Sequence, residues 1–104
     1  MVMSTKYYIS GKISNGGAEP IEENLKRFNE VAQQLRAQGH EVFNPAELEV
    51  EGGASWEYYL ARDLKWIYEN RPTLYVLPNW KESQGARLEV EWGQLLGLDI
   101  QFVV

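Results

Sequence analysis

The chain has 104 residues, a formal net charge of −5 at pH 7, and 44% hydrophobic and 24% charged residues. This length predicts one domain over residues 1–104 with a single layered core. The acidic balance argues against general binding to nucleic acid or to acidic membranes, and the absence of cysteine excludes disulfides and thiolate chemistry. The single histidine gives no basis for a zinc site, and we expect neither a metal nor a cofactor.

The N-terminal residues Met-Val-Met-Ser-Thr-Lys lack the long apolar core of a secretion signal. No apolar run is long enough to span a bilayer. We therefore expect a cytoplasmic protein.

In the first half of the chain, Lys6–Ser10 has the pattern of a short strand, which ends at Gly11 before a Ser14–Gly17 loop. Pro20 stands where a helix begins, and Gly39 where that helix ends. Apolar residues recur between them with helical spacing, at Ile21, Leu25, Phe28, Ala32 and Leu35. His40–Phe43 predicts a second strand that stops at Asn44-Pro45.

The second half repeats this alternation. After a polar connection, Ser55 is the expected N-cap of a helix over 56–70, which Pro72 ends. Thr73–Leu77 predicts a buried third strand, Ser83 starts a third helix to about Leu96, and Gly97 closes it. A last strand is expected at 100–104.

Alternating strands and helices predict an α/β fold with helices on both faces of a parallel sheet. We expect a flavodoxin-like three-layer α/β/α sandwich with a four-stranded, mainly parallel sheet in the order 2-1-3-4. In such sheets ligands bind beyond the carboxyl ends of the strands, where the loops here are 11–17 and 78–83.

The Ser83–Glu89 segment opens the third helix beside that site. A hydroxyl and a glycine at a helix start offer free N–H groups and the positive end of the helix dipole, which predicts an anion site. The apolar stripe is assigned to Leu88, Trp92, Leu95 and Leu96. Glu89 is expected between this stripe and the small residues Gly85, Ala86 and Gly93, where a ligand can approach. Spacing alone supports at least as well an ordinary glutamate of an amphipathic helix. The position of Glu89 one turn after the Ser-Gly helix start favours a role in a ligand site. Glu91 falls nearer solvent.

Asp63 lies inside an apolar helical stripe formed by Trp56, Leu60, Leu64 and Ile67. A carboxylate there is costly unless it has partners or a purpose. A structural ion pair with Arg or Lys, or a loop cap, is the alternative to a site carboxylate, which we favour.

Other candidates cluster near the first strand and the loop before Ser83. Tyr8 and Ser10 alternate on the strand, and Gly11 permits close approach of the backbone to a ligand. Lys12, Ser14 and Asn15 can contact a ligand or remain solvated, and Trp80 can stack on a base or pack on the domain. His40 is expected to be structural.

The chain resembles the nucleoside 2-deoxyribosyltransferase superfamily, which includes the 2′-deoxynucleoside 5′-phosphate N-hydrolases. Its likeness is to a small branch, often phage-encoded and described only as a domain of unknown function. The pieces that carry the resemblance span nearly the whole chain in order. They are Tyr8–Gly11, Asn24 with Phe28-Asn29, Gly39–Glu47, Arg62–Leu64, Leu77-Pro78 with Trp80, and Ser83–Glu89.

The resemblance implies a role for each matching position. Glu89 corresponds to the nucleophile that attacks C1′, Asp63 to the aspartate that protonates the base or holds the sugar, and Tyr8 to a tyrosine that orients both. Ser83 and Gly85 correspond to the residues that bind the 5′-phosphate. Further substrate contacts are assigned to nearby side chains and backbone, namely Ser10, Gly11, Lys12, Asn15, Trp80 and Arg87.

The expected function is cleavage, or base exchange, at the N-glycosidic bond of a (deoxy)nucleoside 5′-monophosphate. The alternatives are a non-catalytic nucleotide-binding module and a transferase acting on unphosphorylated nucleosides. Transferases of the superfamily complete their site with a longer C-terminal segment, which favours the hydrolase. The resemblance and the aromatic residues Trp56, Tyr58, Tyr59 and Trp66 predict a homodimer or higher homo-oligomer, with action in the host cytoplasm if a phage encodes it.

Overall fold

The structure of the protein, a computed structural model, describes residues 5–13, 21–49 and 55–103. Four strands form one parallel sheet in the order β2-β1-β3-β4. The strands are β1 (Lys6–Ser10), β2 (Glu41–Phe43), β3 (Thr73–Val76) and β4 (Ile100–Phe102). The predicted strand order is confirmed, and the two central strands are β1 and β3.

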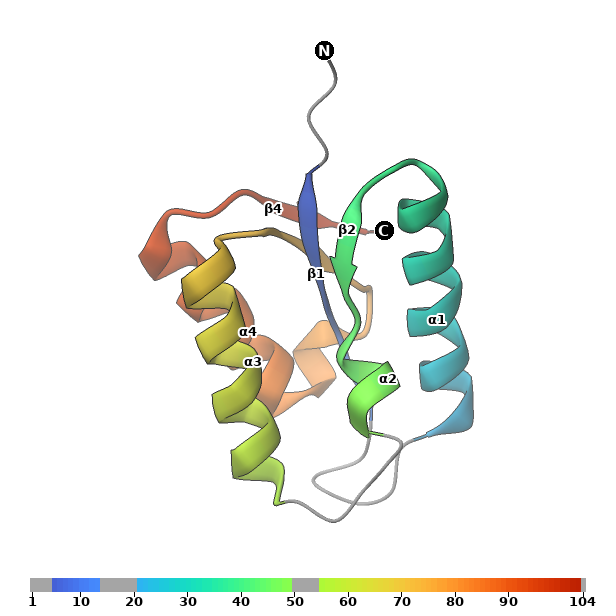
Figure 1. Ribbon diagram of the computed structural model, residues 1–104. Coiled ribbons are helices and arrows are strands. Elements are labelled where there is room, and N and C mark those ends of the chain that lie inside the picture. Colours follow the sequence, from blue (N-terminus) through green and yellow to red (C-terminus); the bar gives the residue numbers. More distant parts are fainter. Residues whose placement is uncertain (1–4, 14–20, 50–54, 104) are drawn as a thin grey trace.

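Helices cover both faces of this sheet (Figure 1). They are α1 (Glu22–Ala37), the short α2 (Pro45–Glu49), α3 (Trp56–Asn70) and α4 (Gln84–Leu96), with a 3₁₀ turn η1 (Trp80–Glu82) before α4. Figure 1 shows α1 on one side of the strands and α3 and α4 on the other. The expected flavodoxin-like three-layer α/β/α sandwich is therefore confirmed.

The side chains of β1 alternate between the two helical layers, as the pleat of a strand requires. Ile9 belongs to the apolar cluster beneath α1, with Phe28 and Leu77 among its members. Tyr8 belongs to the cluster beneath α3 and α4, and Ser10, two residues on, is directed to the same side, where it bonds Glu89. Both Tyr8 and Ser10 are fully buried, so two hydroxyl groups are held inside the α3–α4 side of the sheet.

The predicted helix caps are present. The hydroxyl oxygen of Ser55 accepts a hydrogen bond from the Tyr58 N–H at the start of α3, and that of Ser83 accepts from the Ala86 N–H at the start of α4. Gly97 ends α4 in the left-handed conformation at φ 73°. The two serine caps fix where α3 and α4 begin, beside the carboxyl ends of the strands, and Gly97 fixes where α4 ends.

Several boundaries differ from the sequence-based prediction, β2 and β3 by one residue each. Residues 45–49 form α2 rather than a polar connection, because Asn44 caps this turn through its Oδ1 to the Ala46 N–H and Pro45 occupies the first helical position. Helix α1 begins at Glu22, after an extended Ile21, and β4 ends at Phe102. Pro20, Ser14, Asn15 and Val104 lie outside the described residues.

The apolar stripe assigned to α4 is correct only in part: Trp92 and Leu96 pack against the core cluster, whereas Leu88 and Leu95 do not. The buried residues of α4 are Ala86, Glu89, Val90 and Gly93, whereas Leu95 is 74% exposed and Leu88 is exposed as well. The reason is close packing on β3: a Cβ on Gly93 would lie 2.5 Å from a methyl carbon of Leu74. Gly93 therefore lets α4 approach the sheet and does not face a ligand.

The described helices include none with the length and apolar character needed to cross a membrane.

Candidate functional site

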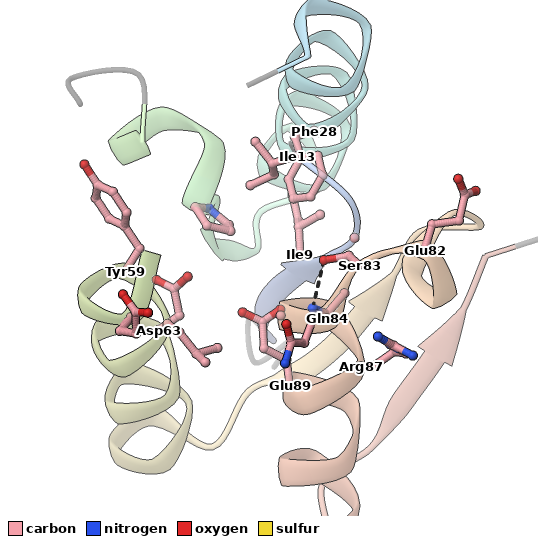
Figure 2. A pocket seen from close by; sticks show the side chains of 16 residues that line it. Ile9, Ile13, Phe28, Tyr59, Asp63, Glu82, Ser83, Gln84, Arg87 and Glu89 are labelled. Atoms are coloured by element: carbon pink, nitrogen blue, oxygen red, sulfur yellow. Dashed lines mark hydrogen bonds between the residues drawn. The ribbon is translucent and has the colours of Figure 1, made fainter. Parts of the chain in front are cut away.

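A cavity of about 390 Å³ lies beyond the carboxyl end of β1, between α3 and α4. Its walls combine apolar and polar groups, including Ile9, Phe28, Pro45, Tyr59, Asp63, Ser83, Gly85 and Glu89. Figure 2 shows Asp63 on α3 and Glu89 on α4 on facing sides of this space. The location agrees with the general position of ligand sites in parallel α/β sheets.

Glu89 is the most constrained polar residue of the cavity. Its side chain is 6% exposed, and both of its carboxylate oxygens accept hydrogen bonds from β1. The Tyr8 hydroxyl donates to Oε2 at 2.5 Å, and the Ser10 hydroxyl donates to Oε1 at 2.8 Å. Because Tyr8 and Ser10 stand on a central strand, they hold the carboxylate in one orientation, which is what a positioned nucleophile requires.

Asp63 lies across the cavity and is 3% exposed. Its Oδ1 accepts a hydrogen bond from Arg62 Nε at 2.8 Å and lies 2.7 Å from Arg62 Nη2. Burial raises the pKa of Asp63 from 3.8 to about 6, although the neighbouring Arg62 guanidinium and the Tyr8 hydroxyl both act to lower it. Asp63 is thus both an ion-pair partner and a cavity residue, and near pH 6 it changes between acid and carboxylate.

Tyr8 lies between the two carboxyl groups. Burial raises its pKa well above 10, and the nearby Glu89 and Asp63 raise it further. The phenol therefore keeps its proton at neutral pH and can serve as a hydrogen-bond donor. A neutral donor beside Glu89 orients that carboxylate without competing with it for the reacting atom.

The first turn of α4, one turn before Glu89, also lines the cavity. Ser83, Gln84 and Gly85 line it, and the Ser83 hydroxyl caps the Ala86 N–H. No acceptor in the described part of the chain takes the N–H groups of Gln84 or Gly85. Together with the helix dipole, these two donors can bind an anion, as the sequence suggests.

Of the remaining candidate residues, some line the cavity and others do not. Gly11 lines the cavity, and a Cβ there would lie 3.0 Å from the Leu77 Cβ, so close packing against the end of β3 also favours a glycine at this position. Arg87 contributes to the cavity edge with an exposed side chain on the side of α4 away from Asp63 (Figure 2). Asn15 lies outside the described residues.

Lys12 and Trp80 do not line the cavity. The Lys12 ammonium pairs with Glu82 at 3.2 Å, and Trp80 packs against Phe102 with ring centroids 5.4 Å apart. His40 accepts a hydrogen bond from the Thr5 N–H through Nδ1, away from the cavity, as expected for a structural histidine.

Three charged residues in or beside the cavity were not identified as site residues from the sequence. Arg62 contacts Asp63 from outside the lining, and its place next to Asp63 in the chain was the one signal of this contact. Glu57 and Glu82 add two carboxylates to the lining, and nothing in their spacing distinguishes them from solvent-facing glutamates. The described residues contain no group of three or more His, Cys, Asp or Glu side chains arranged to hold a metal ion.

The arrangement can support acid–base and nucleophilic chemistry in one enclosed space. Glu89 is held by hydroxyl donors, whereas Asp63 is buried and protonates near pH 6. Two carboxyl groups in different environments can take different roles, one as nucleophile and the other as proton donor.

Residues 5–102 match the model of the family described as a domain of unknown function, DUF4406, and the chain belongs to this family. The matched segment extends from just before β1 to the end of β4, so it contains the whole sheet and the residues around the cavity. No match was found among curated proteins.

Proposed function

We propose that the protein is an N-glycosidase that cleaves, or exchanges the base of, a (deoxy)nucleoside 5′-monophosphate. The observation that carries this proposal is the buried Glu89, held through both oxygens by Tyr8 and Ser10 and facing Asp63 across a cavity of about 390 Å³. The resemblance of the sequence to the nucleoside 2-deoxyribosyltransferase superfamily points to the same residues. The cavity volume is within the usual range for small-molecule sites.

In the proposed first step, a Glu89 oxygen attacks C1′ and the C1′–N bond breaks through an oxocarbenium-like transition state. The bonding electron pair leaves with the base, which takes a proton from the acid form of Asp63. Water then attacks C1′ of the glycosyl ester and gives a proton to the Asp63 carboxylate, while the bond to Glu89 breaks with return of the Glu89 carboxylate. In an exchange reaction a second base replaces this water.

Tyr8 and Ser10 assist these reaction steps by orienting the Glu89 carboxylate. The two hydrogen bonds hold the carboxylate against rotation, so an oxygen lone pair stays directed at the anomeric carbon. A 5′-phosphate is assigned to the first turn of α4, where the N–H groups of Gln84 and Gly85 are available to donate hydrogen bonds to its oxygens.

One observation favours a second candidate, an enzyme acting on unphosphorylated nucleosides. Among the described residues that line the cavity, four are acidic, Glu57, Asp63, Glu82 and Glu89, and one is basic, Arg87. Lys12 is already paired with Glu82. Such a lining repels a phosphate more than it repels a neutral nucleoside, so the two candidates predict opposite substrate preferences.

The test is incubation with a panel of deoxynucleotides, ribonucleotides and nucleosides, with free base measured by chromatography for wild type and Glu89→Gln. Base release from monophosphates by the wild type alone supports the leading proposal, and release from nucleosides in preference supports the second. No release from any compound, together with a ligand-induced rise in melting temperature, would instead favour a non-catalytic nucleotide-binding module.

A further inference from the structure

Arg62 is held in an unusual way for a helix residue next to its ion-pair partner. Adjacent helix residues project about 100° apart, so they do not normally face each other. The Arg62 side chain nevertheless folds back until Nε and Nη2 both lie within 2.8 Å of the same oxygen, Oδ1 of Asp63. The second carboxyl oxygen, Oδ2, receives neither of these contacts.

Two aromatic rings hold the guanidinium in this position. The Arg62 Cζ lies 5.1 Å from the ring centroid of Tyr59 and 5.8 Å from that of Phe43, within the range of cation–π contacts. Tyr59 lines the cavity, and Phe43 stacks on Tyr8, which in turn bonds Glu89. Arg62 is therefore connected to the proposed nucleophile, Glu89, through contacts that run by way of Phe43 and Tyr8.

Arg62 has little freedom to leave this arrangement. Its side chain is 22% exposed, and Nη2 is buried with no hydrogen-bond partner in the described part of the chain besides its close approach to Asp63. Losing that contact would leave a buried cationic group unpaired, which is strongly unfavourable. The contact between the guanidinium and Oδ1 is thus expected to persist in both protonation states of Asp63, as an ion pair with the carboxylate and as a hydrogen bond with the acid.

We propose that Arg62 is a positioning residue for Asp63, occupying Oδ1 so that the acid form of Asp63 carries its proton on Oδ2 and delivers it from there. This inference rests on the proposed function, because it assigns Arg62 the task of preparing the proton donor. A planar guanidinium is suited to the task, since it keeps its charge at all relevant pH values and its fork fixes the carboxyl plane.

The charge of Arg62 also lowers the pH at which Asp63 holds a proton, against the larger effect of burial. The titratable groups facing Asp63 are Arg62 on α3, Tyr8 on β1 and Glu89 on α4, with Glu57, Tyr59, Glu82 and Arg87 elsewhere in the lining. Arg62 is the only cation that contacts Asp63 among the described residues. Removing it leaves a buried carboxyl group with its acid form favoured.

The composition of the chain allows a direct test. Asp63 and Asp99 are the only two aspartates, so protein carrying ¹³C at the aspartate carboxyl gives two carboxyl NMR signals. Asp99 is exposed, and its signal persists in Asp63→Asn, which assigns both signals. The titration would be recorded for wild type, Arg62→Met, Arg62→Lys, and Lys65→Met as a control that removes an exposed cation from the same helix.

In Arg62→Met we expect the Asp63 midpoint to rise by about 1–3 pH units. Arg62→Lys should recover part of this change and covers the case in which Arg62→Met does not fold. Lys65→Met should leave the midpoint close to that of wild type. A midpoint that moves no further in either Arg62 variant than in Lys65→Met would overturn the inference.

The pH–rate profile of base release separates this inference from the proposed function. If Asp63 donates the proton, the decline of activity at high pH should move upward with the NMR midpoint in Arg62→Met. A midpoint that moves while the profile stays in place would contradict the positioning role. Absence of turnover in wild type with every substrate refutes the proposed function, whereas the NMR titration still decides whether Arg62 controls Asp63.

Discussion

Replacing Asp63 with Asn should change how the stability of the protein depends on pH. The pKa of Asp63 is raised from 3.8 to about 6 in the folded protein, chiefly by burial. The folded state therefore binds more protons than the unfolded state between about pH 4 and pH 6, and this residue's contribution to stability is lost as the pH rises through that window. The raised pKa corresponds to about 3 kcal/mol.

Asparagine does not ionise, so Asp63→Asn lacks this dependence. The free energy of unfolding of wild type minus that of the variant should fall by about 3 kcal/mol between about pH 3.5 and pH 7.5. Urea unfolding of both proteins across this range measures the difference, and groups that titrate equally in both cancel. Asp99→Asn, at an exposed position, controls for the loss of one acidic residue.

A difference that stays constant with pH would refute the reasoning, because it would mean that Asp63 titrates alike in the folded and unfolded chain. A difference that rises with pH would mean that Arg62 outweighs burial, so that the folded protein favours the carboxylate form of Asp63.

Three further substitutions probe separate parts of the site. Tyr8→Phe removes the 2.5 Å hydrogen bond to the buried glutamate and should lower kcat about 10–100-fold in a base-release assay, and an unchanged kcat would exclude an orienting role. Ser83→Ala should lower the free energy of unfolding in urea by about 1 kcal/mol and should also weaken the binding of a monophosphate measured by calorimetry. Ser55→Ala removes the corresponding cap of α3 and should lower only the stability. Equal losses of binding in the two variants would place the phosphate elsewhere. Gly93→Ala introduces a methyl group 2.5 Å from a β3 side chain and should destabilise by about 1–3 kcal/mol in urea unfolding, and no loss would contradict the close packing of α4 on the sheet.

Most of the fold could be predicted because its signals are local. The Ser55 and Ser83 caps, the glycine after α4 and the apolar strands each depend on a few neighbouring residues, and all are present in the structure. Helix α2 was missed because the dipeptide Asn44-Pro45 is compatible with two structures. It can end a strand, and it can also start a helix when the asparagine caps the first turn, as it does here.

The packing of α4 could not be obtained from periodicity. Of the large apolar residues expected on the core face, Trp92 and Leu96 pack against the core, but Leu88 and Leu95 are exposed. The most deeply buried apolar contacts of the helix come instead from Ala86, Val90 and Gly93. Small residues carry little hydrophobic signal, and their value comes from the close approach that they allow. Gly93 faces Leu74 from a distant part of the chain, a contact that only the tertiary structure reveals.

The candidate site was predicted in part. The alternation of Tyr8 and Ser10 and the apolar setting of Asp63 indicated buried polar groups, and both hydroxyls bond Glu89. The ion pair between Arg62 and Asp63 shows that the structural alternative considered for Asp63 also holds, since the residue is both paired and in the cavity. Lys12 and Trp80 do not line the cavity, because the conformation of their loops directs them to contacts with Glu82 and Phe102 respectively.

The most direct test of the account compares two glutamates on one helix. Glu89 is buried in the cavity and Glu91, two residues on, is exposed, so Glu89→Gln and Glu91→Gln make the same chemical change in different places. With the best substrate of the panel, Glu89→Gln should lower kcat by more than about 10³-fold while the dissociation constant measured by calorimetry stays within a few-fold. Glu91→Gln should match wild type in both measurements. Full base release by Glu89→Gln would contradict the account.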